Sequence, residues 1–174
     1  YSIKGILNMV KSVIMSKINP NVVARGGSTL EQQLIKNVYF DGGRNIKTTT
    51  RKIQEIYLAS QLDQNFSKEQ ILTYYMNHLS YAEGTNGLKG AMMTYFGKKP
   101  ADYNEKTPEN IAQIAYLAGL GQNPTIYNLY TEPENAKTRT NTVLGVMKDK
   151  GLITKQEYTA AKAYDLTPKP RYWQ

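Results

Sequence analysis

Five basic side chains crowd into one short stretch of this sequence. They fall within 17 residues of one another: Lys36, Arg44, Lys47, Arg51 and Lys52. Arginine binds phosphate oxygens in a bidentate manner, whereas lysine acts as a mobile point charge. Such a density of cations favours an anion with more than one phosphate, such as a diphosphate. The stretch lacks the spacing of a P-loop, which argues against a nucleotide-hydrolysing site.

One carboxylate accompanies these cations. Glu55 follows Lys52 by three residues and Arg51 by four, so a helix would bring the three side chains together. Cations this close would keep the carboxylate ionised near neutral pH, which suits an electrostatic or metal-binding role better than that of a general acid. A helical salt bridge is the simpler interpretation and stays open. The cation precedes the anion here, however, which is the weaker orientation for such a pair.

The segment from Gly26 to Asn37 predicts a loop that turns into a helix. Ser28 and Glu31 fit a capping box, so Ser28 is the expected N-cap. The free N–H groups at such a helix start favour anion binding. Polar donors ending in a cation share one helix face: Thr29, Gln32, Gln33 and Lys36. An apolar stripe follows another face: Leu30, Leu34 and Val38. A capped surface helix with solvated polar groups is the alternative interpretation.

Metal-binding patterns are weak. The chain has no cysteine, and His78 is its single histidine. The absence of cysteine excludes a disulfide and a thiolate metal site, and we find no zinc-site spacing. A lone histidine without a visible partner is usually structural, so we assign His78 no role.

The positive charge is concentrated at the N-terminal end. The whole chain carries a net charge of +8, and residues 1–52 hold nine lysines and arginines against two acidic residues. Such a basic field implies an anionic partner, namely phosphate, nucleic acid or an acidic lipid surface. No DNA-binding motif is visible. The 14 tyrosines beside three phenylalanines suit wet or interfacial surfaces.

Helical periodicity dominates the chain, and no strand alternation is sustained. An amphipathic helix over residues 3–18 presents lysines beside its apolar stripe, which suits either a membrane surface or an ordinary core-facing helix. Helix-start signals recur along the chain: Thr48 to Thr50, Ser67 with Gln70, Thr107 with Pro108, Glu132 or Pro133, and Thr154 with Glu157. The helix that begins at Ser67 is expected to have an apolar stripe: Ile71, Leu72, Tyr75, Met76 and Leu79. Gly97 is expected to end a short helix from Leu88. The fold class is therefore all-α.

The 40% hydrophobic content is enough for a real core, and 174 residues suit one domain. We assign residues 1–166 to this domain and residues 167–174 to the beginning of a C-terminal linker, because two prolines break up the end of the chain. The first residue is Tyr1 rather than Met, so we expect the domain to be incomplete at its N-terminus.

Several motifs resemble those of the peptidoglycan glycosyltransferases, glycosyltransferase family 51. Gly26 to Asn37 is similar to the signature G-G-S-T-(I/L)-x-Q-Q-x-x-K-N, and Arg51 to Ala59 to R-K-x-x-E-x-x-x-A. Lys68 to Asn77 resembles K-x-x-I-L-x-x-Y-L-N. Further matches follow in order: Gly84, Gly87, Tyr95 to Gly97, Asn123 with Pro124, Tyr127, Arg139 and Val143 with Leu144. The family forms the polymerising domain of class A penicillin-binding proteins and the monofunctional transglycosylases.

The resemblance implies a lysozyme-like helical domain that polymerises lipid II. In this reaction a sugar hydroxyl of the acceptor attacks the anomeric carbon of the growing chain, and the diphosphate lipid leaves. Lys36 and Arg44 would hold the donor diphosphate, and Glu55 would be the second catalytic glutamate. The donor site would be lined by Ser28, Thr29, Gln32, Gln33, Arg51 and Lys52, with Asn77 as a supporting substrate-site residue.

Partners and location also follow from the resemblance. The implied partners are lipid II, the growing glycan chain, the membrane surface and moenomycin-type inhibitors, without nucleic acid. A divalent cation, Mg or Mn, would bind together with the substrate diphosphate, with Glu55 as the one candidate ligand. The enzyme would lie at the outer face of the bacterial cytoplasmic membrane, anchored by a segment outside this chain.

The chain departs from the family pattern at three points. The first family motif, E-D-x-x-F-x-x-H-x-G, supplies the general-base glutamate and is absent, so we expect this chain by itself to be inactive. Glu31 replaces the usual threonine, and Gln54 stands where some relatives have lysine. Three alternatives stay open: a non-catalytic module that binds lipid diphosphates, a lysozyme-like glycan hydrolase, and a basic nucleic-acid binder. A retaining hydrolase needs two carboxylates about 5 Å apart, and only Glu55 is a candidate.

Overall fold

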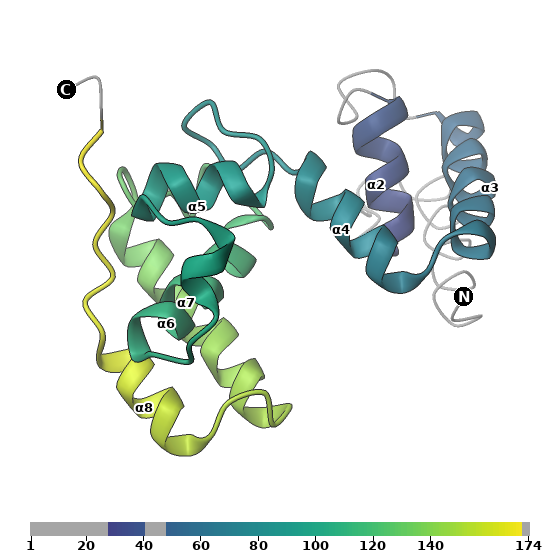
Figure 1. Cartoon of the computed structure of the whole chain (residues 1–174). Coiled ribbons are helices and arrows are strands. Elements are labelled where there is room, and N and C mark those ends of the chain that lie inside the picture. The colour runs from purple at the N-terminus through teal and green to yellow at the C-terminus, as the bar shows by residue number, and fades with distance from the viewer. Residues whose placement is uncertain (1–27, 41–47, 172–174) are drawn as a thin grey trace, which may run out of the picture. The chain divides into compact units, whose positions relative to one another are not determined.

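Helices account for nearly all regular structure in the computed structural model, which describes residues 28–40 and 48–171 (Figure 1). The described residues contain no strand, only an isolated bridge between Ser80 and Asn86. The all-α class is therefore confirmed. The chain divides into two units, one ending at His78 and one beginning at Leu79, and each is described by itself. The expected helix over residues 3–18 lies outside the described residues.

The first unit contains three described helices. These are α2 (Leu30–Tyr39), α3 (Thr49–Asn65) and α4 (Lys68–His78). Helix α2 packs against both α3 and α4 (Figure 1). Each helix buries apolar side chains: Leu34 and Ile35 from α2, Ala59 from α3 and Ile71 from α4.

The start of α2 differs from the prediction. Its N-cap is Thr29 rather than Ser28, because the Thr29 hydroxyl accepts the backbone N–H of Gln32 at 3.4 Å. The Glu31 carboxylate instead accepts a hydrogen bond from Lys68 Nζ at 2.8 Å, so the expected capping box does not form. The apolar stripe also shifts, since Val38 is 46% exposed.

The other helix starts in this unit follow local sequence rules. Thr48 caps α3 by accepting the backbone N–H of Arg51 at 3.2 Å. Ser67 and Gln70 form the predicted capping box before α4: the Ser67 N–H donates to Gln70 Oε1 at 2.9 Å, and the Gln70 N–H donates to Ser67 Oγ at 3.2 Å. Both starts are confirmed.

The second unit is built around one buried helix. Helix α6 (Pro108–Leu120) packs against α5 (Leu88–Phe96), α7 (Pro133–Asp149) and α8 (Lys155–Ala163). A short 3₁₀ helix, η2 (Pro100–Tyr103), follows α5; its four residues are too few to show a period in sequence. The predicted caps of this unit are confirmed: Thr107 before α6, the Thr154–Glu157 capping box before α8, and Gly97 in the left-handed conformation after α5.

A group of tyrosines fills the core between α5 and α6. Tyr95 and Tyr116 are almost fully buried and meet edge to face, with ring centroids 5.4 Å apart. Tyr116 OH accepts the backbone N–H of Leu129 at 3.1 Å, and Tyr95 OH donates to the carbonyl of Tyr81 at 3.1 Å. Burial raises the pKa of Tyr95 to about 12. Both hydroxyls are therefore satisfied inside the core.

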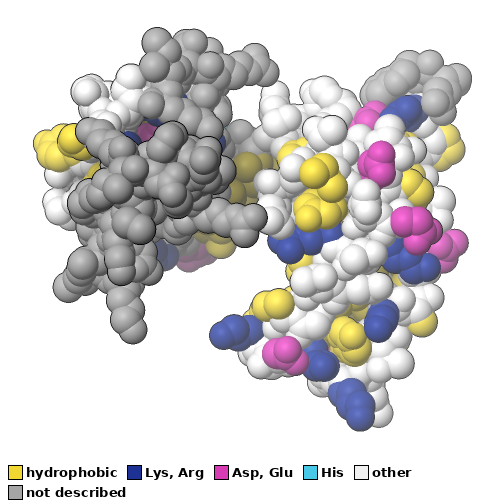
Figure 2. All heavy atoms as spheres, turned by 180° about the vertical axis from the view of Figure 1, so that it is seen from behind, with side chains coloured by type: hydrophobic (Ala, Val, Ile, Leu, Met, Phe, Trp, Pro, Cys, Tyr) yellow, Lys and Arg dark blue, Asp and Glu magenta, His cyan; other side chains and the backbone are white. Residues whose placement is uncertain are grey.

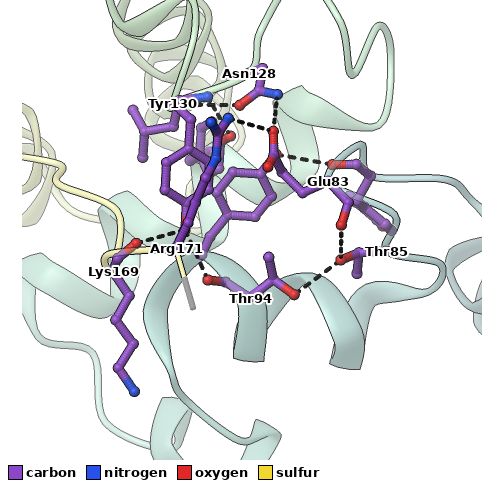
Figure 3. Close-up of polar contacts among 11 residues, drawn as sticks. Glu83, Thr85, Thr94, Asn128, Tyr130, Lys169 and Arg171 are labelled. Atoms are coloured by element: carbon purple, nitrogen blue, oxygen red, sulfur yellow. Dashed lines mark hydrogen bonds and ion pairs between the residues drawn. The ribbon is translucent and has the colours of Figure 1, made fainter. Parts of the chain in front are cut away.

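The C-terminal segment runs back along the second unit (Figure 1), and Figure 3 shows Lys169 and Arg171 beside Tyr130. The Lys169 N–H donates to the carbonyl of Tyr95, and Tyr130 OH donates to the carbonyl of Lys169, both at 2.7 Å. Arg171 forms an ion pair with Glu83 Oε1 at 3.0 Å, and its guanidinium lies over the ring of Tyr130. The described part of residues 167–174 thus packs on the unit; its role as the start of a linker stays a prediction.

Glu83 sits in an unusual loop before α5. Ala82 and Glu83 both have positive φ angles, 64° and 51°, which non-glycine residues seldom adopt. The Glu83 carboxylate also accepts a hydrogen bond from Asn128 Nδ2 at 2.8 Å. The contacts with Asn128 and Arg171 hold this backbone in place.

The surface of the second unit carries no single charge sign on the face shown in Figure 2. Basic, acidic and apolar side chains are interspersed there. The second unit, residues 79–174, holds 12 basic and 9 acidic residues, so this mixture is what the sequence leads one to expect. The basic excess belongs to the N-terminal part of the chain.

Candidate functional site

Lys52 is the centre of a polar cluster between α2 and α3. Its ammonium donates to Ser28 Oγ and Gln32 Oε1, each at 3.1 Å, and to Glu55 Oε2 at 3.0 Å. An ammonium has three N–H donors, so these three acceptors match its full capacity. Gln32 lies in the first turn of α2 and Ser28 just before the N-cap of that helix, whereas Lys52 and Glu55 lie in the first turns of α3. The cluster therefore forms because α2 packs on α3.

Glu55 is the buried member of this cluster. Only 2% of its side chain is exposed, and each carboxylate oxygen faces a cation: Oε1 lies 3.0 Å from Arg51 Nε and Oε2 lies 3.0 Å from Lys52 Nζ. A buried carboxylate is tolerated when it is paired in this way. The predicted grouping of Arg51, Lys52 and Glu55 is thus present, and the three side chains together carry a net charge of +1.

A second layer of contacts surrounds the start of α2. Gln33 Nε2 donates to the main-chain carbonyl of Ser28 at 3.3 Å, and Tyr75 OH donates to Gln33 Oε1 at 3.1 Å. Tyr75 comes from α4. The sequence placed it in an apolar stripe, and no local pattern shows that its hydroxyl reaches α2.

Only some of the remaining predicted site residues lie near the Lys52 cluster. Lys36 is one turn beyond Gln32 on α2, so both fall on the helix face toward Lys52. Thr29 is the N-cap of the same helix. Asn77 is an exposed residue in the last turn of α4, and no contact among the described residues ties it to the Lys52 cluster. Arg44, together with Lys47, lies outside the described residues.

An ion-pair bridge that the sequence did not predict joins the three described helices of the first unit. Lys68 at the start of α4 pairs with Glu31 of α2 and with Asp63 of α3. Burial alone would raise the pKa of Glu31, but hydrogen bonds from Lys68, from its own backbone and from Thr29 outweigh it, so the pKa is lowered. Glu31 is the residue that replaces the family threonine, and Lys68 offsets its charge.

The lowered pKa of Glu31 predicts a pH effect on stability. Because the folded pKa lies below the unfolded value, the stabilisation is present above about pH 4.5 and is lost as the pH falls through the folded pKa. We expect the melting temperature of Glu31→Gln to fall less than that of wild type when the pH is lowered from 6 to 3.5. The difference should be small, below about 1 kcal/mol, because the Lys68 side chain is 73% exposed.

Thermal unfolding followed by circular dichroism checks this prediction. Glu69→Gln is the matched control, since Glu69 is an exposed carboxylate in the first turn of the same helix as Lys68. If the melting temperatures of wild type and Glu31→Gln fall equally as the pH is lowered, the stabilising role of the Glu31 carboxylate is contradicted.

The donor set of the cluster suits an anion better than a metal ion. The described residues contain no group of three or more His, Cys, Asp or Glu side chains that could hold a metal. Glu55 Oε2 accepts a hydrogen bond from Lys52, and Oε1 lies 3.0 Å from Arg51 Nε in an ion pair, so a metal ion bound directly to this carboxylate would lie beside two cations. Cationic and amide N–H groups at the N-terminus of α2 are instead the groups that bind phosphate oxygens.

Comparison with known proteins identifies the family. The family described as Transglycosylase matches residues 3–148. Penicillin-binding protein 1A of Streptococcus oralis is 43% identical over 79% of this chain and 21% of its own length. The monofunctional glycosyltransferase of Staphylococcus saprophyticus is 32% identical over 92% of this chain and 57% of its own length.

A crystal structure of penicillin-binding protein 1A from Haemophilus influenzae is also similar, at 24% identity. It covers 80% of this chain and 16% of that protein, with a TM-score of 0.48, which is too distant a likeness to support an inference about the fold. The chain spans only about a fifth of the length of the Streptococcus oralis relative. On the match over residues 3–148, the chain belongs to the Transglycosylase family.

Proposed function

We propose that this chain serves in a peptidoglycan glycosyltransferase that polymerises lipid II into glycan strands during bacterial cell-wall synthesis. The observation that carries the proposal is the Lys52 cluster. Residues of two family motifs, one on α2 and one on α3, meet there around a single ammonium. The family membership and the presence of cations suited to an anion both support a substrate that carries a diphosphate.

The cluster supports the departure of a diphosphate lipid. The acceptor hydroxyl oxygen forms a bond to the anomeric carbon of the donor, and the bond from that carbon to the diphosphate oxygen breaks. Negative charge builds on the departing diphosphate, where Lys36 and the amide N–H groups of Gln32 would donate to it and Lys52, whose three N–H groups are already bonded, would stabilise it through its charge. The proton of the acceptor hydroxyl passes to a general base, which the resemblance places in the first family motif, absent from this sequence.

Glu55 serves this site by organising the cations. Both of its oxygens are engaged by Arg51 and Lys52, so it holds these two side chains in position. We propose that Mg or Mn, where it takes part, arrives with the diphosphate rather than in a site built by the protein. No step of the proposed reaction depends on it.

Location and inhibition follow from the proposed substrate. Lipid II is held in a membrane, so we propose that the protein acts at the outer face of the cytoplasmic membrane. Among the described residues, no helix has the length and apolar character needed to cross a bilayer. Moenomycin-type inhibitors are expected to compete for the donor site.

Polymerisation of lipid II by the full protein that contains this chain tests the proposal. Glycan strands that disappear on addition of moenomycin are the expected product. Lipid II binding without strands would favour a non-catalytic module. Release of new reducing ends from preformed glycan would favour a hydrolase, and either result would overturn the proposal.

A further inference from the structure

Tyr75 connects α4 to the polar cluster through two hydrogen bonds. Its hydroxyl donates to Gln33 Oε1 at 3.1 Å, and Gln33 Nε2 donates to the carbonyl of Ser28 at 3.3 Å. Lys52 Nζ reaches the hydroxyl of the same serine at 3.1 Å. The Ser28 carbonyl is therefore held by Gln33 of α2, which Tyr75 of α4 contacts in turn, and the Ser28 hydroxyl is held by Lys52 of α3.

The hydroxyl of Tyr75 also fixes the orientation of an amide. A carboxamide can rotate to exchange its oxygen and nitrogen, and the partners of the two ends decide which arrangement is stable. With the hydroxyl donating to Oε1, the nitrogen of Gln33 faces the Ser28 carbonyl. Without that donor, the Gln33 amide has one fewer restraint, and so has the backbone just before α2.

We propose that Tyr75 is a positioning residue for the diphosphate site. It acts through Gln33, whose amide it orients, and through Ser28, whose hydroxyl belongs to the Lys52 cluster. The inference rests on the proposed function, because it assumes that Ser28 and Gln33 face the donor diphosphate. The sequence alone placed Tyr75 in an apolar stripe.

The packing of α4 does not depend on this hydroxyl. Ile71 is fully buried and supplies the apolar anchor of the helix, whereas Tyr75 is only half-buried. Burial raises the pKa of Tyr75, so its hydroxyl stays protonated and able to donate throughout the physiological range. Tyr75→Phe removes one donor and leaves the ring in place.

The neighbouring residue gives a matched control. Tyr74 is exposed and packs edge-on against Phe66, with ring centroids 5.7 Å apart. Tyr74→Phe makes the same chemical change on the same helix, away from Gln33. The two variants should have melting temperatures within about 2 °C of each other.

The experiment measures two properties of the full chain. Calorimetry gives the affinity for farnesyl diphosphate, a soluble prenyl diphosphate, and NMR gives the side-chain amide signals of Gln33. We expect Tyr75→Phe to weaken binding by about threefold to tenfold and to shift the Gln33 amide signals, whereas Tyr74→Phe does neither. In a Gln33→Ala background, Tyr75→Phe should have no further effect on affinity.

The outcomes separate this inference from the proposed function. If wild type does not bind farnesyl diphosphate, the proposed function is contradicted, and unmoved Gln33 signals in Tyr75→Phe would additionally overturn the positioning role. If wild type binds and Tyr75→Phe binds equally well, the positioning role is wrong while the proposed function stands. Additive effects of Tyr75→Phe and Gln33→Ala on affinity would also overturn the positioning role, because Tyr75 would then not act through Gln33.

Discussion

Glu55→Gln should reduce lipid II polymerisation by the full protein at least about 100-fold, as loss of a charged group at a preorganised electrostatic site typically does. The carboxylate holds Arg51 Nε and Lys52 Nζ, each at 3.0 Å, on its two oxygens. Glutamine keeps one of these acceptors and presents an NH₂ group to the other cation. The geometry of both cations around the diphosphate is then lost.

The same substitution should also cost stability. Glu55 is 2% exposed, so a mismatched amide there should cost about 1–3 kcal/mol of unfolding free energy. Arg51 and Lys52 are partly exposed and can be hydrated, so the chain should stay folded. Polymerisation assays beside thermal melts measure both effects, and Glu55→Asp tests for partial rescue by charge. Activity near that of wild type in a folded Glu55→Gln protein would show that the glutamate is a structural ion-pair residue only.

Two lysines of the proposed donor site should respond differently to removal of their charge. Lys52→Met leaves Gln32 Oε1 and Glu55 Oε2 without their shared donor, and both residues are buried. We expect a loss of about 3 kcal/mol of stability, in addition to at least tenfold weaker diphosphate binding. Lys36→Met should weaken binding to a similar extent and leave the melting temperature nearly unchanged, since no ion pair involves Lys36 among the described residues.

Calorimetric titration with farnesyl diphosphate and thermal melts of both variants test this contrast. Lys89→Met, on α5 of the second unit, is a control for loss of an exposed positive charge. Equal losses of stability in the Lys36 and Lys52 variants would mean that both lysines are structural. Unchanged affinity in both would remove the anion site from the proposal.

Local rules predicted most of the helix starts, but not that of α2. Ser28 and Thr29 are adjacent hydroxyl residues, and either can cap a helix. The choice depends on Glu31, which the sequence paired with Ser28 and the fold pairs with Lys68, 37 residues further on. Such a contact has no signal within a short window, so the local pattern selected the wrong cap.

The candidate site was likewise predicted only where local spacing decides the contacts. The grouping of Arg51, Lys52 and Glu55 follows from helical spacing alone, and it was predicted. Helical periodicity does not predict contacts between helices. Gln32 was placed on a polar face, but its hydrogen bond with Lys52 requires α2 to pack on α3. Tyr75 was predicted to be part of an apolar stripe because its aromatic ring fits that pattern. The pattern does not indicate which group its hydroxyl binds.

The return of the C-terminal segment has a practical consequence for anyone trimming this protein. A chain cut after α8 would lose the N–H that Lys169 gives to Tyr95 and the carbonyl that it offers to Tyr130. Glu83 would lose Arg171 from a loop whose backbone is already strained. Shortened versions intended for crystallography or inhibitor screening should therefore retain residues up to at least 171, and affinity tags belong beyond that position.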